Sequence, residues 1–209
     1  MYLFTRRTKL SPGPMAERME WAVKVTEKVN QITPLNVGLW MSQFSPAVGT
    51  ISWGAAVESL TDLEDANAKL SVDNMFLDVL NQGADYTNGQ LDDQLAQFIH
   101  NPAAPDGNPR YVSVVQSQLA AGCFQRGVEL GIQIAQVGSE ISGVPTAFLI
   151  GTTGNYGATA WIAGTETLQA LQQGEEAINA NAEFIKLVDE VSTCYLPSAT
   201  TQTIWRRIV

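Results

Sequence analysis

The sequence predicts an α+β fold in which one βαββαβ unit occurs twice in tandem. Two observations lead to this prediction: an internal repeat that spans nearly all of the 209 residues, and a proline-rich segment between the two copies. The predicted organisation is a first repeat at 1–100, a linker at 101–109 and a second repeat at 110–209. Three prolines and a glycine in the linker oppose both a helix and a central strand there.

The repeat appears when the chain is aligned with itself. A shift of 109 residues matches the first parts of the two copies, for example Tyr2 with Tyr111, and a shift of 108 matches the rest. The identities are few, so the inference depends on their order and on matching apolar periods. It also depends on Trp53 matching Trp161, because a matched pair of tryptophans is rare.

Each copy begins with a predicted strand and a long helix. Residues 2–8 and 111–118 are rich in β-branched and aromatic side chains and lead to glycine-containing breaks. Apolar residues then recur at spacings of three and four, which is typical of a helix with one buried face. They are Met15, Met19, Ala22, Val25, Val29 and Ile32 in the first copy, and Leu130, Ile134, Val137 and Ile141 in the second.

A β-hairpin follows in each copy. Residues 35–42 alternate apolar with small or polar side chains, as a strand packed on one face should, and 144–150 is its counterpart. Turn residues then lead into the strands that carry Trp53 and Trp161.

Helix caps mark the next elements. Ser59 and Thr167 stand at equivalent positions where a hydroxyl can cap a helix start, and Glu58 and Glu166 just before them are predicted to be a structural pair. Shorter helices and closing strands complete each copy, at 74–80, 182–188, 93–100 and 201–208.

The predicted order of elements is that of a ferredoxin-like unit, a sheet with helices on one face. Its bare face needs a cover, and the sheet of the other copy is available across a short linker. We therefore expect two tandem ferredoxin-like units packed sheet to sheet as an intramolecular α+β barrel.

Composition narrows the class of partner. The formal net charge of −9, without a basic run, argues against nucleic acid and against an anionic membrane surface. No apolar run approaches the ~18 residues of a membrane span. Cys123 and Cys194 have no CxxC spacing, which suggests neither a zinc site nor a redox pair. These features predict a reduced, cytoplasmic protein.

The pattern resembles the dimeric α+β barrel superfamily. The resemblance is carried by the order of elements, by the capped helix after the tryptophan strand and by the stretches Asp-Asn-Met-Phe at 73–76 and Asn-Ala-Glu-Phe at 181–184. The superfamily includes antibiotic-biosynthesis monooxygenase-like, EthD-like and NIPSNAP-like proteins, and this chain resembles a tandem fused form. The resemblance implies pairing of two units, and activities that range from cofactor-free oxygenation to haem chemistry to none known.

Catalytic and cofactor signals are weak. Haem branches of the superfamily use a histidine, and this chain has one, His100, at the predicted end of a strand, so no haem is expected. A nucleophilic triad would need the same histidine as its base. Asp92 and Asp93 are neighbours that point apart on a strand and are predicted to be turn or edge residues, so no metal is expected. The glycine-rich stretch 151–157 lacks a following lysine and predicts a turn.

The aromatic residues divide into matched and unmatched positions. Trp53 and Trp161 are matched, which favours a shared structural role between the two sheets. Trp40 corresponds to Leu149 and is unmatched. A ligand site in one half only would use unmatched residues, so Trp40 and His100 are the candidate ligand-binding residues.

Two functions remain open. The first is a noncatalytic protein that acts in self-assembly or in binding a small apolar ligand. The second is a cofactor-independent monooxygenase or isomerase for a small apolar or aromatic substrate. A buried cavity of several hundred Å³ with a polar group inside favours the second, and a large apolar interface without one favours the first. By analogy with the fold, a homo-oligomer is expected.

Overall fold

The computed structural model describes residues 1–102 and 109–209, and it has the mixed α and β composition that the sequence predicts. The chain divides into two compact units. The first unit comprises 1–43, 47–95 and 207–209, and the second comprises 44–46 and 96–206. The predicted linker lies mostly outside the described residues, so the domain boundaries stay a prediction.

The first unit is a sheet with helices. Strand β3 pairs antiparallel with both β1 and β2, and the C-terminal residues Ile208 and Val209 hydrogen-bond to Leu39 of β2. Its elements are β1 (Tyr2–Leu10), α1 (Met15–Ile32), β2 (Gly38–Gln43), β3 (Thr50–Val57), α2 (Leu60–Leu70), α3 (Asn74–Asn81), α4 (Gly83–Tyr86) and the beginning of β4 (Thr87–His100).

Strand β4 is longer than the sequence predicts, and it includes two residues that were expected in a turn or at an edge. Asp92 and Asp93 lie inside this strand, not in a turn, and β4 begins at Thr87, six residues before the predicted start. Both oxygens of the Asp93 carboxylate accept hydrogen bonds from the Arg6 guanidinium of β1, each at 2.7 Å. This two-point contact raises the pKa of Arg6. An acidic residue that appeared to be a sheet-edge feature therefore joins β4 to β1.

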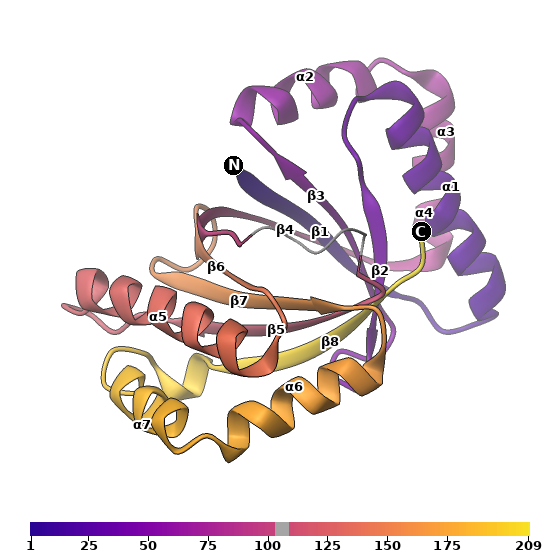
Figure 1. Ribbon diagram of the computed structural model, residues 1–209. Coiled ribbons are helices and arrows are strands. Elements are labelled where there is room, and N and C mark those ends of the chain that lie inside the picture. The colour runs from indigo at the N-terminus through magenta and orange to yellow at the C-terminus, as the bar shows by residue number, and fades with distance from the viewer. Residues whose placement is uncertain (103–108) are drawn as a thin grey trace. The chain divides into compact units, whose positions relative to one another are not determined.

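The second unit is also a sheet with helices. Strand β5 pairs antiparallel with β7 and β8, and β6 pairs with β7 and with the end of β4. Figure 1 shows α5, α6 and α7 on one face of these strands. Its elements are β5 (Tyr111–Gln118), α5 (Phe124–Ser142), β6 (Thr146–Gly151), β7 (Ala158–Thr165), α6 (Leu168–Ala180), α7 (Ala182–Val191), the short 3₁₀ helix η1 (Pro197–Ala199) and β8 (Thr201–Arg207).

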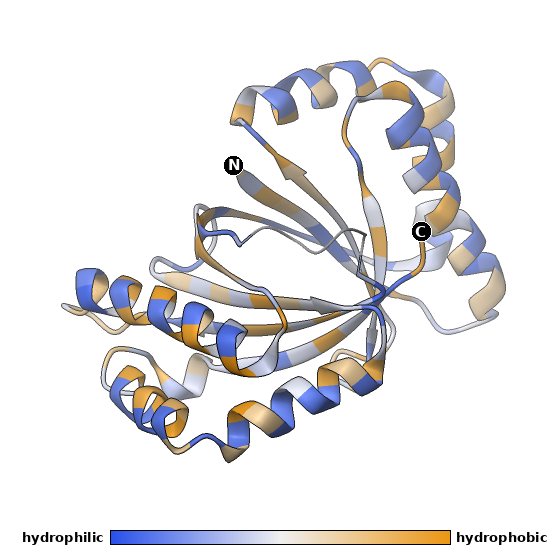
Figure 2. Ribbon diagram, in the orientation of Figure 1, coloured by the Kyte–Doolittle hydropathy of each residue, from blue (hydrophilic) through white to orange (hydrophobic). Residues whose placement is uncertain are grey.

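Local chemistry explains where the helices begin. The Ser59 hydroxyl accepts a hydrogen bond from the Asp62 backbone, and the Asp62 carboxylate accepts one from the Ser59 backbone. The Thr167 hydroxyl accepts from Ala170 at the start of α6. The helices carry a hydrophobic and a hydrophilic side (Figure 2), so each has one face to bury.

The long helices of the two units end in the same way. In the first unit the Thr33 hydroxyl donates to the Val29 carbonyl at 2.9 Å and accepts from the backbone N–H two residues later. In the second unit the Ser142 hydroxyl donates to the Gly138 carbonyl at 2.7 Å and accepts from the corresponding N–H. The shift of 109 residues found in the sequence thus relates hydrogen bonds as well as residue types.

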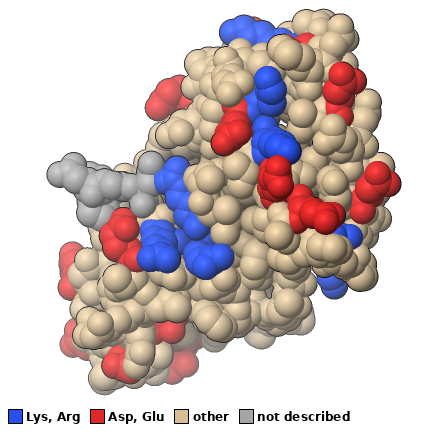
Figure 3. Space-filling model, turned by 90° about the vertical axis from the view of Figure 1, so that its right-hand side faces the viewer, with Lys and Arg blue, Asp and Glu red and all other residues tan. Residues whose placement is uncertain are grey.

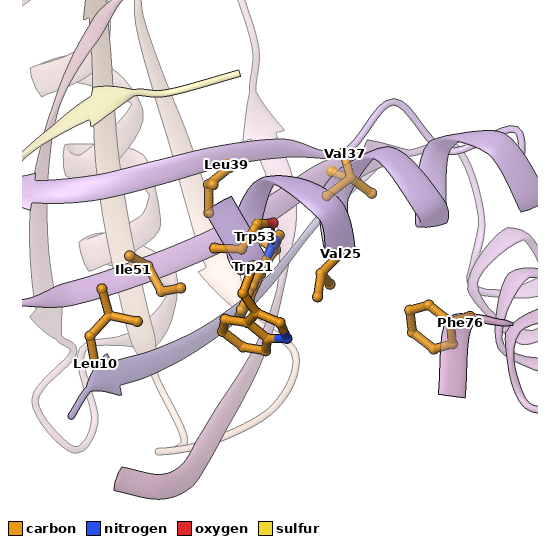
Figure 4. Packing of buried hydrophobic residues seen from close by; sticks show 10 residues of the cluster. Leu10, Trp21, Val25, Val37, Leu39, Ile51, Trp53 and Phe76 are labelled. Carbon is orange, nitrogen blue, oxygen red and sulfur yellow. Dashed lines mark hydrogen bonds between the residues drawn. The ribbon is translucent and has the colours of Figure 1, made fainter. Parts of the chain in front are cut away.

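Two indole rings organise the core of the first unit (Figure 4). Trp21 and Trp53 meet edge to face, with ring centroids 5.7 Å apart. The Trp53 Nε1–H donates to the Thr26 hydroxyl at 3.0 Å, and the Trp21 Nε1–H donates to the Val79 carbonyl at 2.9 Å. Each buried indole therefore has a hydrogen-bond acceptor, and the two rings join α1 to β3 and α3.

Charged side chains of both signs lie on the surface. On the face shown in Figure 3, basic side chains lie in small groups with acidic side chains beside them. No helix in residues 1–102 or 109–209 is long and apolar enough to cross a membrane.

Candidate functional site

A cavity of about 560 Å³ lies between the sheet and the helices of the second unit and is open to solvent on one side. Most of the lining is apolar, with contributions from strands β5 and β7 and helices α5, α6 and α7. Its size falls within the usual range of ~300–1,000 Å³ for small-molecule sites. The main apolar lining residues are Val115, Ile134, Trp161, Leu171 and Phe184.

Small residues on two helices leave this space open. Gly138 of α5 and Gly174 of α6 both line the cavity. The corresponding positions of the first unit are Val29 and Ala66, which carry larger side chains. The second unit thus has less side-chain volume over its sheet at two matched positions.

A polar chain leads into the cavity from β8. The Gln202 side-chain amide donates to the Glu175 carboxylate at 2.7 Å and to the Ser113 hydroxyl at 3.1 Å. Gln202 is exposed, whereas Ser113 is buried. The Ser113 hydroxyl accepts the Gln202 bond and still has its own O–H to donate. This hydroxyl can hold an oxygen atom of a ligand in a mainly apolar space.

A second pair of hydroxyls stands on the same face of β5. Ser117 lies four residues beyond Ser113, and alternate residues of a strand share a face. Its hydroxyl is 2.7 Å from the hydroxyl of Thr200, and both residues line the cavity. Two separated polar points therefore face the same apolar space.

Trp161 and Tyr195 form an aromatic part of the lining. The Trp161 Nε1–H donates to the Gly131 carbonyl at 2.8 Å, and the Tyr195 hydroxyl donates to the Gly127 carbonyl at 2.7 Å. The two ring centroids are 5.2 Å apart. Both polar groups are bonded to α5, so the rings present apolar surface to the cavity.

Burial raises the pKa of Tyr195 well above the ordinary value of 10.0, and the neighbouring Cys194 adds to this effect. The raised pKa means that Tyr195 ionises at lower pH in the unfolded protein than in the folded protein. The contribution of the neutral phenol to the free energy of unfolding is therefore fully present below about pH 10 and is lost as the pH rises above this value. We expect Tyr195→Phe to lower the free energy of unfolding by about 1 kcal/mol at neutral pH through the lost hydrogen bond.

Urea unfolding at about pH 9 and about pH 11 checks this prediction, because ordinary tyrosine ionises between these values. The wild type should lose more stability than Tyr195→Phe across this interval. Equal losses would contradict the assignment of a buried, hydrogen-bonded phenol.

The residues predicted from the sequence are not brought together here. Trp40 lies half-buried in β2 of the first unit, with the Arg207 guanidinium 6.0 Å from its ring centroid. His100 ends β4, opposite Phe148 of β6. Neither lines the cavity, and their ligand-binding role stays a prediction. Trp161, predicted as structural, is a lining residue.

The matched residues occupy similar places in their own units. Trp53 and Trp161 are buried in β3 and β7, and each indole donates a hydrogen bond to the long helix of its own unit. The predicted location between the two sheets was therefore wrong, because both rings lie on the helix side of their strands. Glu58 and Glu166 are exposed just before the caps of α2 and α6, and their structural role stays a prediction.

The lining does not fit haem held through histidine. Its residues offer no imidazole, thiolate or thioether, the side chains that most often bind haem iron. Across the described ranges, no group of three or more histidine, cysteine, aspartate or glutamate residues is placed to hold a metal ion.

Comparison with known proteins identifies the fold but no family. No family model matches the chain, and no curated protein is significantly similar to it. Among solved structures, a monooxygenase candidate from Fusobacterium nucleatum has a TM-score of 0.72 at 8% identity, covering 100% of this chain and 92% of that one. An anthrone oxidase-like protein has a TM-score of 0.67 at 11% identity, covering 100% and 91%. A chlorite dismutase candidate has a TM-score of 0.61 at 9% identity, covering 100% and 96%.

These proteins belong to the dimeric α+β barrel superfamily, so the resemblance predicted from the sequence is confirmed at the level of fold. Their names describe different activities, and a shared fold does not select among them. The tandem fused form and the EthD-like and NIPSNAP-like branches stay predictions.

Proposed function

We propose that the second unit binds one small, mainly apolar molecule that carries a hydroxyl or carbonyl oxygen. The cavity between its sheet and helices is the observation that supports this most strongly. Small-molecule sites typically combine such an apolar space with a few placed polar groups. Ser113 supplies one of these groups, and Trp161 supplies an aromatic wall for a planar ligand.

The proposed ligand is uncharged. Glu175 is the one charged residue among the described lining residues, and it is acidic. The lining therefore offers no cation to pair with a carboxylate, and Glu175 would repel one. A neutral phenol should bind better than a carboxylic acid of the same ring size.

Titration calorimetry with 2-naphthol tests the proposal. We expect one site per chain and weaker binding of 2-naphthoate. Gly138→Val, which restores the bulk found at Val29 of the first unit, should weaken 2-naphthol binding at least about tenfold, or about 1.4 kcal/mol. Gln136→Val is a matched control, because it adds the same side chain to an exposed position of α5 outside the cavity. Equal affinities of the two variants would contradict the proposed site.

Cofactor-independent oxygenation is a second candidate function, and a cavity of several hundred Å³ with a polar group inside is the feature that was expected from the sequence to favour it. It is supported by a fold in common with a monooxygenase candidate and an anthrone oxidase-like protein, together with a cavity suited to an aromatic ring. The corresponding reaction would be anthrone plus O₂ giving anthraquinone and water. Oxygen uptake with anthrone, lost in Gly138→Val and kept in Gln136→Val, would favour catalysis. Binding without uptake would favour the noncatalytic function.

We also propose that the chain is a tandem fusion of two ferredoxin-like units. The matched hydrogen bonds at Thr33 and Ser142 support this, as do solved structures that align with both units in one chain. A homo-oligomer, and self-assembly as part of the function, are proposed by analogy with the fold. A monomeric mass by light scattering at micromolar concentration would contradict them.

A further inference from the structure

The two cysteines, far apart in the sequence, belong to one small region of the second unit. Cys123 immediately precedes α5, and Cys194 follows α7. The backbone N–H of Ala120 donates to the Cys194 carbonyl at 2.8 Å, and Leu119 forms an isolated antiparallel bridge with Tyr195. The segment that leads into α5 therefore runs directly alongside the segment that follows α7.

The side chains also face the same place. The Cys123 thiol donates to the carbonyl of Thr193, the residue next to Cys194, with 3.9 Å between sulfur and oxygen. A Cβ added at Gly127, one turn after Cys123 on α5, would lie 3.6 Å from the Cys194 Cβ. Because residues four apart share a face of a helix, Cys194 packs against the face of α5 that begins at Cys123.

The two thiols differ in access. Cys123 is partly exposed, whereas Cys194 is buried with 4% of its surface accessible. The neighbouring Cys194 thiol raises the pKa of the Cys123 thiol, and burial adds to the rise. A smaller fraction of Cys123 is therefore thiolate at neutral pH, so its reaction with a peroxide is slow.

We infer that Cys123 and Cys194 form a reversible intramolecular disulfide under peroxide. The Cys123 sulfur attacks one peroxide oxygen, forming sulfenic acid and releasing one water. The Cys194 sulfur then displaces the hydroxyl group from that sulfenic acid, forming the S–S bond and releasing a second water. Two thiols and one hydrogen peroxide give one disulfide and two waters.

The position of this bond gives it a structural consequence. The loop that it closes contains α5, β6, β7, α6 and α7, which together supply most of the cavity lining. Cross-links that close long loops restrict the unfolded chain. The oxidised protein should therefore be more stable than the reduced one, independently of whether the cavity binds a ligand.

Intact mass spectrometry of the full chain tests the inference. After hydrogen peroxide, catalase and N-ethylmaleimide, we expect a monomer that has lost two hydrogens and carries no maleimide. Peptide mapping should join the Cys123 and Cys194 peptides, and dithiothreitol should restore two alkylatable thiols. The chain holds two cysteines, so the assignment is unambiguous.

Cys123→Ser and Cys194→Ser serve as controls and should each give a monomer without the internal cross-link. The same peroxide treatment in urea should form less of the disulfide, because the native fold brings the sulfurs together. The inference is overturned if both wild-type thiols remain alkylatable. It is also overturned if Cys123 proceeds to sulfinic acid while Cys194 stays free, or if cross-links form between chains alone.

Discussion

Replacing Trp161 by alanine should lower the free energy of unfolding by about 3–5 kcal/mol, the usual cost of removing a large buried aromatic side chain. The indole is buried and lies between Phe148 and Tyr195, with ring centroids 5.3 and 5.2 Å away. Its Nε1–H also satisfies the Gly131 carbonyl at 2.8 Å. The variant would lose ring packing and a buried hydrogen bond together.

Urea denaturation measures the loss of unfolding free energy in Trp161→Ala, and two further variants serve for comparison. Trp161→Phe keeps most of the ring packing and should cost mainly the hydrogen bond and some volume, about 1–2 kcal/mol. Trp40→Ala removes the same side chain from a half-buried position in β2 and should cost less than Trp161→Ala. Similar losses in Trp40→Ala and Trp161→Ala would contradict the central position of Trp161.

Two glycines on α5 should respond to alanine with opposite signs. A Cβ at Gly131 would lie 2.3 Å from Cζ of Phe148, a fully buried ring, so Gly131→Ala should lower the free energy of unfolding by about 1–3 kcal/mol. A Cβ at Gly138 would lie 3.4 Å from the Phe184 ring, an ordinary contact. Gly138→Ala should therefore raise stability by about 0.5–1 kcal/mol through its helix propensity.

The first unit supplies a control for this pair. Its residues at the positions of Gly131 and Phe148 are Ala22 and Leu39, so the helix residue is larger and the strand residue is smaller there. The double variant Gly131→Ala, Phe148→Leu should recover part of the stability that Gly131→Ala loses. Denaturation curves in which the double variant is as unstable as the sum of the single changes would contradict this account of the contact.

Local patterns were sufficient to predict most of the secondary structure. The apolar spacing between Met15 and Ile32 predicted a helix where α1 is found, and Ser59 and Thr167 are the caps of α2 and α6. Strand β4 was predicted too short, because its first half is polar and exposed and carries no apolar alternation. Its contact with β1 includes the Arg6–Asp93 ion pair, a pairing across 87 positions that no local pattern contains.

The candidate site was mostly not predictable. In the sequence, Ser113 and Ser117 look like ordinary polar residues of an alternating strand. Their contacts with Gln202 and Thr200 depend on the pairing of β5 with the β8 region, which the sequence does not show. Gly138 was one indication of the cavity in the sequence, because the first copy has an apolar residue at the matching position. The cysteines are 71 positions apart, so their spacing gave no reason to pair them. They come close because the segment after α7 runs beside the segment that leads into α5.

The most direct test of the central claim is a crystal structure of the protein with 2-naphthol bound. We predict that the ring lies between the sheet and the helices of the second unit, against Trp161. Its hydroxyl should lie within hydrogen-bonding distance of Ser113 or Ser117. Side chains filling this space, or naphthol bound elsewhere while the space stays closed, would contradict the proposal that the second unit is a small-molecule site.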